Sequence, residues 1–405
     1  RVVLLERETF PRFQIGESLL PFNNDLFDQL GLSETLQRGG FVRKFGAEFV
    51  TGDALRSHRF RFDANLPSRY GQSLQVRRAE FDQILLENAR RAGTAVNEGW
   101  RVVDVDLSDP DRVVVTAIGP DGERKTIETR MVIDASGHAG VIASREERIE
   151  REDRKKIAVF AHYRNVAPSA EGDEAGNIVI TILKNGWLWL IPLSDELTSV
   201  GLVVDSAEFR ASGLTPETLL EETIRMTPYT HARMSAAERV TAVRARKDYS
   251  YRMDRLIGPN HALVGDAAGF IDPIFSTGVF LAMKSAELAA VGIERRLSTG
   301  SLRLLKRYER SMQRVLERYT RIIDSFYQRE FLEVFLNPQK NLALVPVVIG
   351  LLAGNAFASS SNRWRMHLFY LLVTIQRWAG VVAPPIPWEN LPEAACAPAS
   401  EVRVG

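Results

Sequence analysis

The chain has 405 residues, 45% of them hydrophobic and 25% charged, which is typical of a globular protein with two domains or one large elaborated domain. Its 52 basic and 51 acidic residues balance, so no broad positive surface for nucleic acid or an anionic membrane is expected. The single cysteine, Cys396, excludes a disulfide framework and a cysteine-ligated metal site, and the six histidines show no ligand spacing. We therefore expect a cytoplasmic protein without a metal site.

The chain begins with RVVLLERE, which predicts a buried β-strand that ends at Glu6. A Val/Leu-rich strand with a terminal acidic residue is typical of the second strand of a Rossmann unit, where the carboxylate binds a ribose diol. The sequence contains no G-x-G-x-x-G motif, so we expect the preceding strand and its glycine turn in roughly the 30 residues before Arg1. A solvated charge is the ordinary alternative for Glu6.

Helices and strands then alternate along the chain. Apolar spacing predicts helices over 18–32 and 77–93, and strands over 101–109, 112–119 and 124–137. From about 156 to 206, short strands follow one another between turn residues, which predicts an antiparallel sheet. A helix is predicted after Thr215, which acts as its N-cap. The simplest assembly is an α/β fold, in which a Rossmann-type body carries an inserted antiparallel sheet.

Trp187 and Trp189 lie two positions apart in the segment NGWLWLIPLSDE. Residues i and i+2 share one face of a strand, so both indoles are expected on the same side. Core packing is the simple explanation, because large aromatic side chains bury well in many places.

The segment HALVGDAAGFIDPIFSTGVFLAMKSAELAA, residues 261–290, predicts a strand, a Gly-Asp turn, a loop and a helix that begins near Ser276. Small residues from Gly265 onward let the backbone approach a flat ligand, and Asp266 can accept hydrogen bonds from sugar or ribityl hydroxyls. The helix N-terminus after FSTG offers N–H groups to an anion. An ordinary βα turn is the alternative for the GDA tripeptide alone.

In combination these segments resemble the FAD-dependent aromatic-hydroxylase superfamily and, within it, the flavin-dependent halogenases. GDAAGFIDP is similar to the flavin-binding G-D segment, DASG to the loop near the FAD pyrophosphate, and QVRRAEFDQILL to the segment whose arginine lies beside the cofactor. Four further segments resemble halogenase motifs, namely PRFQIGESLLP, KFGAEF, WLWLIP and FIDPIFSTG. The resemblance extends from residue 1 to about residue 385.

The resemblance implies a role for each matching residue. It implies FAD binding by Glu6, Gly16, Glu17, Ser18, Arg78, Ser136, Gly137, Gly265, Asp266, Pro273 and Gly278. It implies halide binding by Ser276, Thr277 and Gly278, and catalytic roles for Lys44, Trp187 and Trp189. A separate reductase would supply reduced FAD, which with O₂ and chloride or bromide yields hypohalous acid. Lys44 would then guide the electrophile to an aromatic substrate, while the two indoles separate that substrate from the flavin.

Two departures from the family pattern affect these expectations. The absent glycine motif makes FAD binding by these 405 residues uncertain. Tryptophan halogenases carry a glutamate at the position of Phe275, so we expect a phenol or pyrrole, free or bound to a carrier protein, rather than tryptophan. Two other functions stay open, namely a flavin monooxygenase or geranylgeranyl-reductase-like enzyme in which Lys44 is incidental, and a non-catalytic binding scaffold.

We expect four regions: a first part of the FAD-binding domain (1–150), an antiparallel substrate-domain sheet (151–255), a second FAD-binding part (256–300) and a C-terminal helical region (301–405). In the last region, the heptad-like stripe of 305–326 is expected to pack on its own domain. The apolar run 342–354 contains Pro346 and is too short to span a membrane. The apolar helix predicted over 363–378 is expected to cover the substrate pocket, with membrane contact as the alternative.

Overall fold

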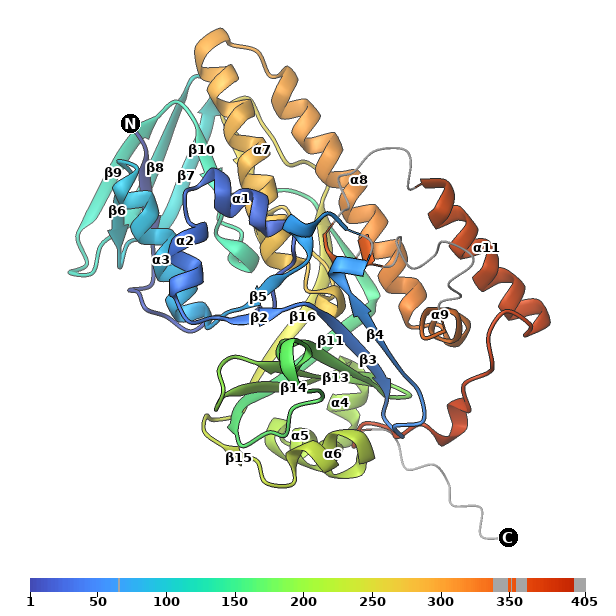
Figure 1. Ribbon diagram of the computed structural model, residues 1–405. Helices are drawn as coiled ribbons and strands as arrows, with labels where there is room; N and C mark the ends of the chain where they lie inside the picture. Colours follow the sequence, from blue (N-terminus) through green and yellow to red (C-terminus); the bar gives the residue numbers. More distant parts are fainter. Residues whose placement is uncertain (65, 338–348, 351, 355–362, 397–405) are drawn as a thin grey trace.

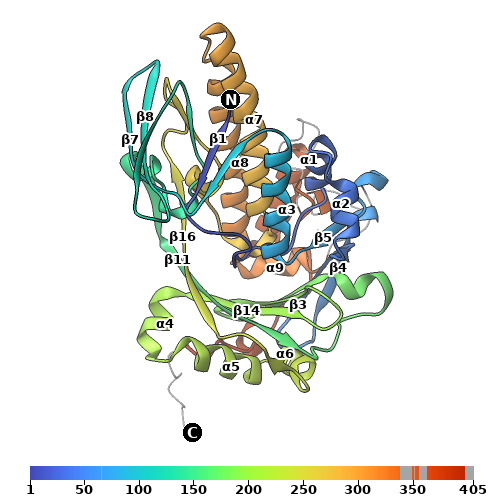
Figure 2. The ribbon, with the colours of Figure 1, turned by 90° about the vertical axis from the view of Figure 1, so that its left-hand side faces the viewer.

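The computed structural model describes residues 1–64, 66–337, 349–350, 352–354 and 363–396. Its architecture is mixed α/β, as the sequence predicts, with one large sheet and long helices on one side of it (Figure 1). The view in Figure 2 shows α4, α5 and α6 beneath the large sheet, and α3, α8 and α9 above it.

The large sheet contains nine strands, eight of them in one path. The order is β18 (Gly269–Phe270), β16 (Arg244–Met253), β11 (Arg148–Arg164), β14 (Thr198–Asp205), β13 (Gly186–Pro192), β12 (Ile178–Ile182), β3 (Gly46–Thr51) and β4 (Ser57–Arg61), with β15 (Glu238–Arg239) paired to β11. Neighbours are antiparallel except β12 and β3, which are parallel. The antiparallel sheet expected from 156 to 206 is present, because β11, β14, β13 and β12 pair antiparallel in that order. The parallel pair adds β3, which comes from a distant part of the chain, so that no hairpin sets its direction.

The strand pairing also bears on the expected domain division, because β3 and β4 precede residue 150 and yet extend the large sheet. The four-region division stays a prediction, and hydrogen bonding favours placing 46–61 with the sheet.

The remaining strands form small sheets beside long helices. Parallel pairs join β1 (Val3–Glu6) to β6 (Ala95–Glu98) and β10 (Val132–Asp134) to β17 (His261–Leu263). An antiparallel pair joins β2 (Val42–Lys44) to β5 (Ser73–Gln75), and three antiparallel strands follow one another as β7 (Arg101–Asp109), β8 (Arg112–Ile118) and β9 (Arg124–Thr129). The predicted segment 124–137 is thus two strands in two different sheets.

Most predicted helices are present, with two differences. The segment 18–32 contains α1 (Asn23–Gln29), after which Gly31 takes a left-handed φ of 67° and α2 (Ser33–Arg38) begins. The helix expected near Ser276 is α7 (Gly278–Thr299). The other helices are α3 (Arg78–Arg91), α4 (Ser206–Ser212), α5 (Pro216–Met226), α6 (Pro228–Met234), α8 (Arg303–Phe326), α9 (Arg329–Phe335) and α11 (Arg363–Ala379). The predicted N-cap of α5 is confirmed, because Thr215 Oγ1 accepts a hydrogen bond from Thr218 N at 3.1 Å.

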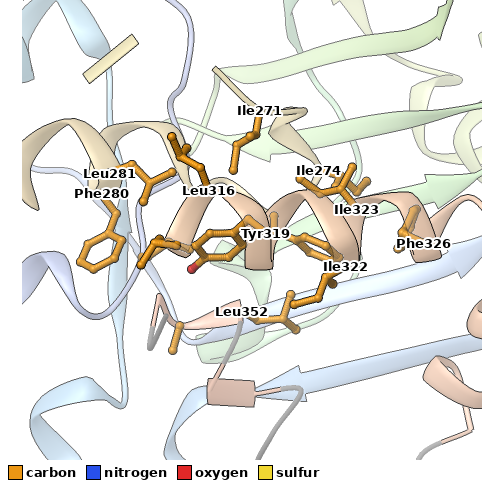
Figure 3. Packing of buried hydrophobic residues seen from close by; sticks show 14 of the residues in the cluster. Ile271, Ile274, Phe280, Leu281, Leu316, Tyr319, Ile322, Ile323, Phe326 and Leu352 are labelled. Atoms are coloured by element: carbon orange, nitrogen blue, oxygen red, sulfur yellow. The ribbon is translucent and has the colours of Figure 1, made fainter. Parts of the chain in front are cut away.

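The heptad-like stripe of α8 packs on its own domain, as expected. All seven of its apolar side chains are buried. Figure 3 shows Tyr319, Ile322 and Ile323 of α8 among side chains from the loop that precedes α7 and from α7 itself. This packing fixes α8 along the segment 261–290, which carries several of the expected site residues.

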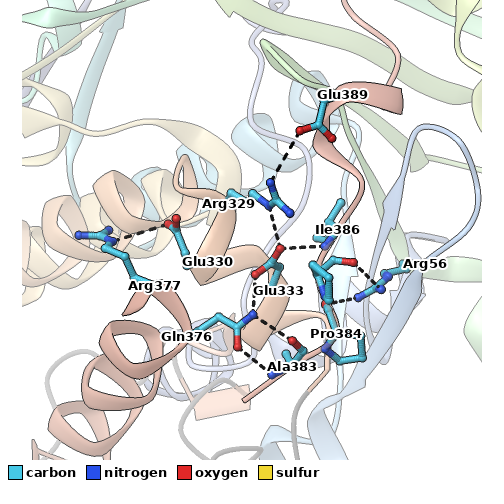
Figure 4. Close-up of polar contacts among 11 residues, drawn as sticks. Arg56, Arg329, Glu330, Glu333, Gln376, Arg377, Ala383, Pro384, Ile386 and Glu389 are labelled. Atoms are coloured by element: carbon cyan, nitrogen blue, oxygen red, sulfur yellow. Dashed lines mark hydrogen bonds and ion pairs between the residues drawn. The ribbon is translucent and has the colours of Figure 1, made fainter. Parts of the chain in front are cut away.

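Helix α11 packs on α9, where the rings of Phe331 and Phe369 lie 5.1 Å apart. A buried polar network holds the chain beyond α11, with Gln376 and Glu333 at its centre (Figure 4). That α11 covers a substrate pocket stays a prediction. The run 342–354 lies mostly outside the described residues, and among those residues no helix has the length and apolar character needed to cross a membrane.

Candidate functional site

Trp187 and Trp189 point to the same side of β13 and are both buried. Their ring centroids lie 5.8 Å apart with planes inclined by 48°. Trp189 lies directly over Gly201 of β14, where a Cβ atom would be only 2.2 Å from Trp189 Cζ2. A glycine on the neighbouring strand therefore makes room for this indole.

A hydrogen-bonded chain connects Trp187 to the loop before α7. Trp187 Nε1 donates to Tyr327 Oη at 3.1 Å, and Tyr327 Oη donates to Asp272 Oδ2 at 2.6 Å. Asp272 Oδ1 accepts a hydrogen bond from Ile274 N at 3.0 Å and so shapes the turn formed by Pro273–Phe275. Tyr327, directly after the end of α8, thus joins the indole pair to the turn that leads to Ser276 by hydrogen bonds.

Lys44 is 2% exposed, so it is not the solvated surface lysine that is the common alternative. Its Nζ donates to Ser18 Oγ at 2.9 Å and to the carbonyl oxygen of Leu19 at 3.0 Å, and it lies 5.6 Å from the centre of the Phe62 ring. Burial lowers the pKa of the Lys44 ammonium from 10.5 to about 7. An amine with such a pKa exchanges its proton near neutral pH, which suits a catalytic group.

The loop of residues 10–18 holds Ser18 in place beside Lys44. Glu17 is buried, and its Oε1 lies 2.8 Å from His162 Nε2 on β11. Gly16 has a φ of 100°, and a Cβ there would lie 3.0 Å from Arg78 Nη1 and 3.9 Å from Val279 Cγ2. The loop therefore lies between α3, the large sheet and the first turn of α7.

Arg78 interacts with protein groups on two sides. Its Nη1 donates to the carbonyl oxygen of Ile15 at 2.6 Å, and its Nε donates to Asp82 Oδ1 at 2.8 Å. The guanidinium thus supports the backbone of the G-E-S loop, and its expected place beside the cofactor stays a prediction.

Residues 276–278 form a cradle at the start of α7. Ser276 adopts a left-handed φ of 57°, and no side chain of the described ranges caps the helix. Thr277 Oγ1 is buried without a hydrogen-bond partner among the described residues. No atom of the described chain lies within 4 Å of where a Gly278 Cβ would be. An open space beside an uncapped helix N-terminus and a donor hydroxyl suits a small anion.

The GDA turn and the DASG loop lie side by side. His138, next to Gly137, has its Nδ1 3.5 Å from Asp266 Oδ2 and its ring 4.5 Å from that of Phe270. Ser136 is fixed by Asp134, whose Oδ1 accepts from Ser136 N at 3.0 Å. Gly265 has a φ of 58° and would place a Cβ 3.2 Å from that of Ala282 on α7. Glu6, by contrast, ends β1, and among the described residues its side chain accepts a hydrogen bond only from Glu8 N, at 2.9 Å.

The structure therefore brings together most of the expected residues around the loop 10–18, β13 and the start of α7. Three residues that sequence reasoning did not single out complete the set, namely His162, Tyr327 and Asp272. In the sequence, His162 was considered only as a possible metal ligand. Tyr327 and Trp187 are far apart in the chain, and no sequence pattern indicates that they are in contact. Metal-ligating side chains nowhere gather in groups of three or more within the described ranges.

Comparisons with known proteins identify the family and the fold. A family model described as tryptophan halogenase matches residues 54–331. A relative from Chondromyces crocatus named tryptophan 2-halogenase is 34% identical over 337 residues, which is 81% of this chain and 63% of the relative. A Pseudomonas fluorescens relative, 1H-pyrrole-2-carbonyl-[peptidyl-carrier protein] chlorinase, is 31% identical over 72% of this chain and 69% of its own. The solved structure of the myxobacterial chondrochloren halogenase CndH, an FAD-dependent halogenase, superimposes with a TM-score of 0.77 and 32% identity, covering 94% of this chain and 85% of CndH. The chain thus spans less than two thirds of the length of the first relative.

Proposed function

Because the chain belongs to the tryptophan halogenase family, we propose that it is a flavin-dependent halogenase that places chlorine or bromine on an electron-rich aromatic ring. The observation that carries this proposal is the environment of Lys44. Its amine is fully buried, has a pKa of about 7, and is held by the loop that also contacts the first turn of α7.

The residues present fit FAD as the cofactor. Gly16, Gly137 and Gly265 all have positive φ values, and no atom of the described chain lies within 4 Å of where a Gly137 Cβ would be. His138 Nε2 and Thr277 Oγ1 are buried without hydrogen-bond partners in the described part of the chain, whereas His138 Nδ1 lies 3.5 Å from Asp266 Oδ2. Such groups are expected beside a bound polar molecule, because unsatisfied buried donors are costly. The roles of Glu6, Glu17, Arg78 and Asp266 toward FAD stay proposals.

When it is bound in reduced form, FAD would supply two electrons to O₂, so that one oxygen atom leaves as water and the other, with a proton, oxidises halide to hypohalous acid. The protein's own residues would then act on the small molecules. The backbone N–H groups of Thr277 and Gly278, with Thr277 Oγ1, bind the halide at the positive end of α7. Lys44 Nζ donates a hydrogen bond to hypohalous acid and orients its halogen toward the ring. The packed indoles of Trp187 and Trp189 keep the ring away from the flavin, so that it is not hydroxylated.

The preferred ring is a phenol or pyrrole, and Phe275 is the reason. This side chain is buried, with its ring 5.6 Å from that of Phe326 and nearly perpendicular to it. No carboxylate stands at this position to stabilise a cationic ring intermediate, so a ring that is already activated is favoured. The names of the two relatives give different substrates, tryptophan and a carrier-bound pyrrole. Our preference for a phenol or pyrrole over tryptophan therefore rests on Phe275. A separate flavin reductase and a cytoplasmic location complete the proposal.

Mass spectrometry of products tests the function. The protein, with FAD, a flavin reductase and O₂, is given a phenol, a pyrrole-2-carbonyl thioester and free tryptophan in turn, with chloride or bromide. We expect halogenated phenol or pyrrole whose mass follows the halide, and little halogenated tryptophan. Hydroxylated product that forms without halide would instead support the monooxygenase alternative.

Lys44→Ala gives the sharper test. We expect this variant to lose halogenated product while oxidation of reduced FAD by O₂ continues nearly unchanged, because the lysine acts only after that step. Lys44→Arg is not expected to restore product, since a guanidinium stays protonated and presents its donors in a different geometry. Equal loss of both rates would indicate a structural role for Lys44, and retained halogenation would remove the main support for the proposal.

A further inference from the structure

The outward face of α8 carries a continuous row of basic side chains. Seven of them are exposed and lie within a sector of about 120° on a helix that turns about 100° per residue; they are Arg303, Lys306, Arg307, Arg310, Arg314, Arg318 and Arg321. At about 1.5 Å per residue the row is roughly 27 Å long. Glu317 is the single exposed acidic residue of this helix. We call these seven residues the basic row.

The basic row differs from the other exposed arginines of this protein because it is continuous along one helix face. Many arginines elsewhere pair with carboxylates, as Arg61 does with Glu174, Arg112 with Glu128 and Arg225 with Glu222. Others, such as Arg124 and Arg130, have no ion pair in the described structure but form no such row. In the described structure, Arg303, Lys306, Arg307, Arg310 and Arg314 have no carboxylate within ion-pair distance. Arg310 and Arg314 each donate only from Nε, to backbone carbonyl oxygens of the preceding helical turn. Their charges are therefore available to a partner in a protein whose overall net charge is only +1.

The C-terminal end of the basic row lies beside the candidate site. A recess there is lined by Thr320 and Asp324 of α8 and by Tyr327 directly after it, together with Lys156, Ser250 and Asp272. Tyr327 is the residue whose hydroxyl accepts the hydrogen bond of Trp187 Nε1. A partner that rests along α8 is thus held next to the tryptophan pair.

We propose that the basic row is the docking surface for the acidic face of a carrier protein that presents the aromatic substrate on a flexible thioester arm. This inference rests on the proposed function and adds to it the surface that recognises the carrier. The carrier's carboxylates pair with the row, and the arm extends past the end of α8 toward the tryptophan pair. Charge pairing of this kind speeds association and sets the orientation of the carrier.

The chemistry of the row favours a folded acidic protein over a membrane or a nucleic acid. Every exposed side chain of α8 is charged, so the row itself offers no apolar residue to enter a bilayer. None is aromatic, so unpaired bases have no stacking platform. A straight row of guanidinium groups instead matches a row of carboxylates on a helix of similar length.

The test uses the double variant Arg307→Glu, Arg314→Glu. The new carboxylates reverse two charges and can pair with neighbouring arginines of the row, so helix formation is retained. The matched control is Arg124→Glu, Arg130→Glu, which makes the same charge change at exposed positions near the three-stranded sheet. The probe is a peptidyl carrier protein loaded with a pyrrole-2-carbonyl thioester, and a free phenol is the carrier-independent substrate.

For the row variant we expect KM for the loaded carrier to rise about tenfold or more, with kcat and the halogenation of free phenol unchanged. We also expect wild-type binding to the carrier to weaken as salt increases, and this salt dependence to shrink in the row variant but not in the control. Three results would overturn the proposal. They are an unchanged KM for the carrier in the row variant, an equal rise of that KM in the control variant, and no binding of wild type to the carrier. Row-dependent binding to anionic phosphatidylserine vesicles or to duplex DNA in place of the carrier would overturn it as well. Absence of any halogenated phenol would count against the proposed function, whereas carrier binding is measured without catalysis.

Discussion

A lysine side chain that leaves water loses the hydration of its ammonium group, and Lys44 has only Ser18 Oγ and the Leu19 carbonyl oxygen as hydrogen-bond acceptors in the described structure. Burial therefore disfavours the charged form and lowers its pKa to about 7. Lys44 is consequently expected to affect both the halogenation reaction and the stability of the folded protein, and these two effects can be measured separately.

The lowered pKa of Lys44 predicts a specific pH dependence of stability. Below about pH 7 the lysine is protonated in both the folded and unfolded states, and the full cost of burying its charge is present. Between about 7 and 10.5 the unfolded state binds more protons, so the free energy of unfolding rises with pH. The unfolding free energies of wild type and Lys44→Met are measured in urea from pH 6 to 9.5. We expect their difference to stay constant below about pH 7 and to shift in favour of wild type as the pH rises further.

The matched control for that titration is Lys125→Met, at an exposed position. A difference between wild type and Lys44→Met that does not change with pH would show that the buried amine keeps its ordinary pKa.

Replacement by alanine is expected to lower stability at one glycine of the candidate site and to leave it unchanged at another. Gly201→Ala places a methyl group 2.2 Å from Trp189 Cζ2, so we expect a loss of about 3 kcal/mol in stability and a changed tryptophan emission spectrum. Gly278→Ala meets no atom of the described chain within 4 Å and improves helix propensity, so we expect normal stability. Its methyl group occupies the halide cradle, and we expect KM for chloride to rise severalfold. Unfolding of Gly278→Ala, or an unchanged chloride KM, would contradict the assigned cradle.

At the scale of elements, the C-terminal segment is held by side-chain hydrogen bonds as well as by apolar packing. Gln376 of α11 is buried, donates from Nε2 to Glu333 Oε2 at 2.7 Å and to the Ala383 carbonyl oxygen at 2.9 Å, and accepts from Val382 N and Ala383 N (Figure 4). Glu333 Oε1 also accepts from Ile386 N at 2.8 Å. One amide therefore joins α9, α11 and the chain that follows.

Gln376→Leu should release this segment, because it leaves buried backbone N–H groups without acceptors. We expect a loss of about 3 kcal/mol in the free energy of unfolding and faster proteolysis between residues 380 and 390. Thr374→Ala, at an exposed position of the same helix, serves as the control and should change neither. Equal protease resistance of Gln376→Leu and wild type would show that apolar contacts alone hold the segment.

At the scale of the whole molecule, the loop 10–18 joins layers that are distant in the chain. Arg12 Nη1 lies 3.1 Å from Asp82 Oδ2 on α3, and Glu17 Oε1 lies 2.8 Å from His162 Nε2 on the large sheet. The loop thus fixes Ser18, and through it Lys44, relative to both layers.

His162→Ala tests this connection. It leaves the buried Glu17 carboxylate without its partner, so we expect a loss of about 3 to 5 kcal/mol in stability and, under conditions where the variant is folded, less halogenated product per FAD oxidised. His162→Gln retains a hydrogen-bond donor and should recover most of both. Full coupling of oxidation to halogenation in folded His162→Ala would show that the loop is positioned by other contacts.

Local pattern was sufficient to predict much of this fold. The stripe of α8, the N-cap at Thr215 and the strand of Trp187 and Trp189 all depend on residues close in the chain, whose periodicity and turn chemistry specify one conformation. The α/β class followed from the order of these elements, and the motifs for Lys44, Gly278 and the two tryptophans were readable for the same reason.

What the sequence could not decide is which distant segments meet. The parallel pairing of β3 with β12, the contact of Tyr327 with Trp187 and the pairing of Glu17 with His162 each join residues more than one hundred positions apart. Such contacts leave no periodic pattern in the sequence, because they form only when the sheets and helices of different layers pack together. The burial of Lys44 belongs to the same class: its motif identified the residue, but only tertiary packing removes it from water and brings its pKa to about 7.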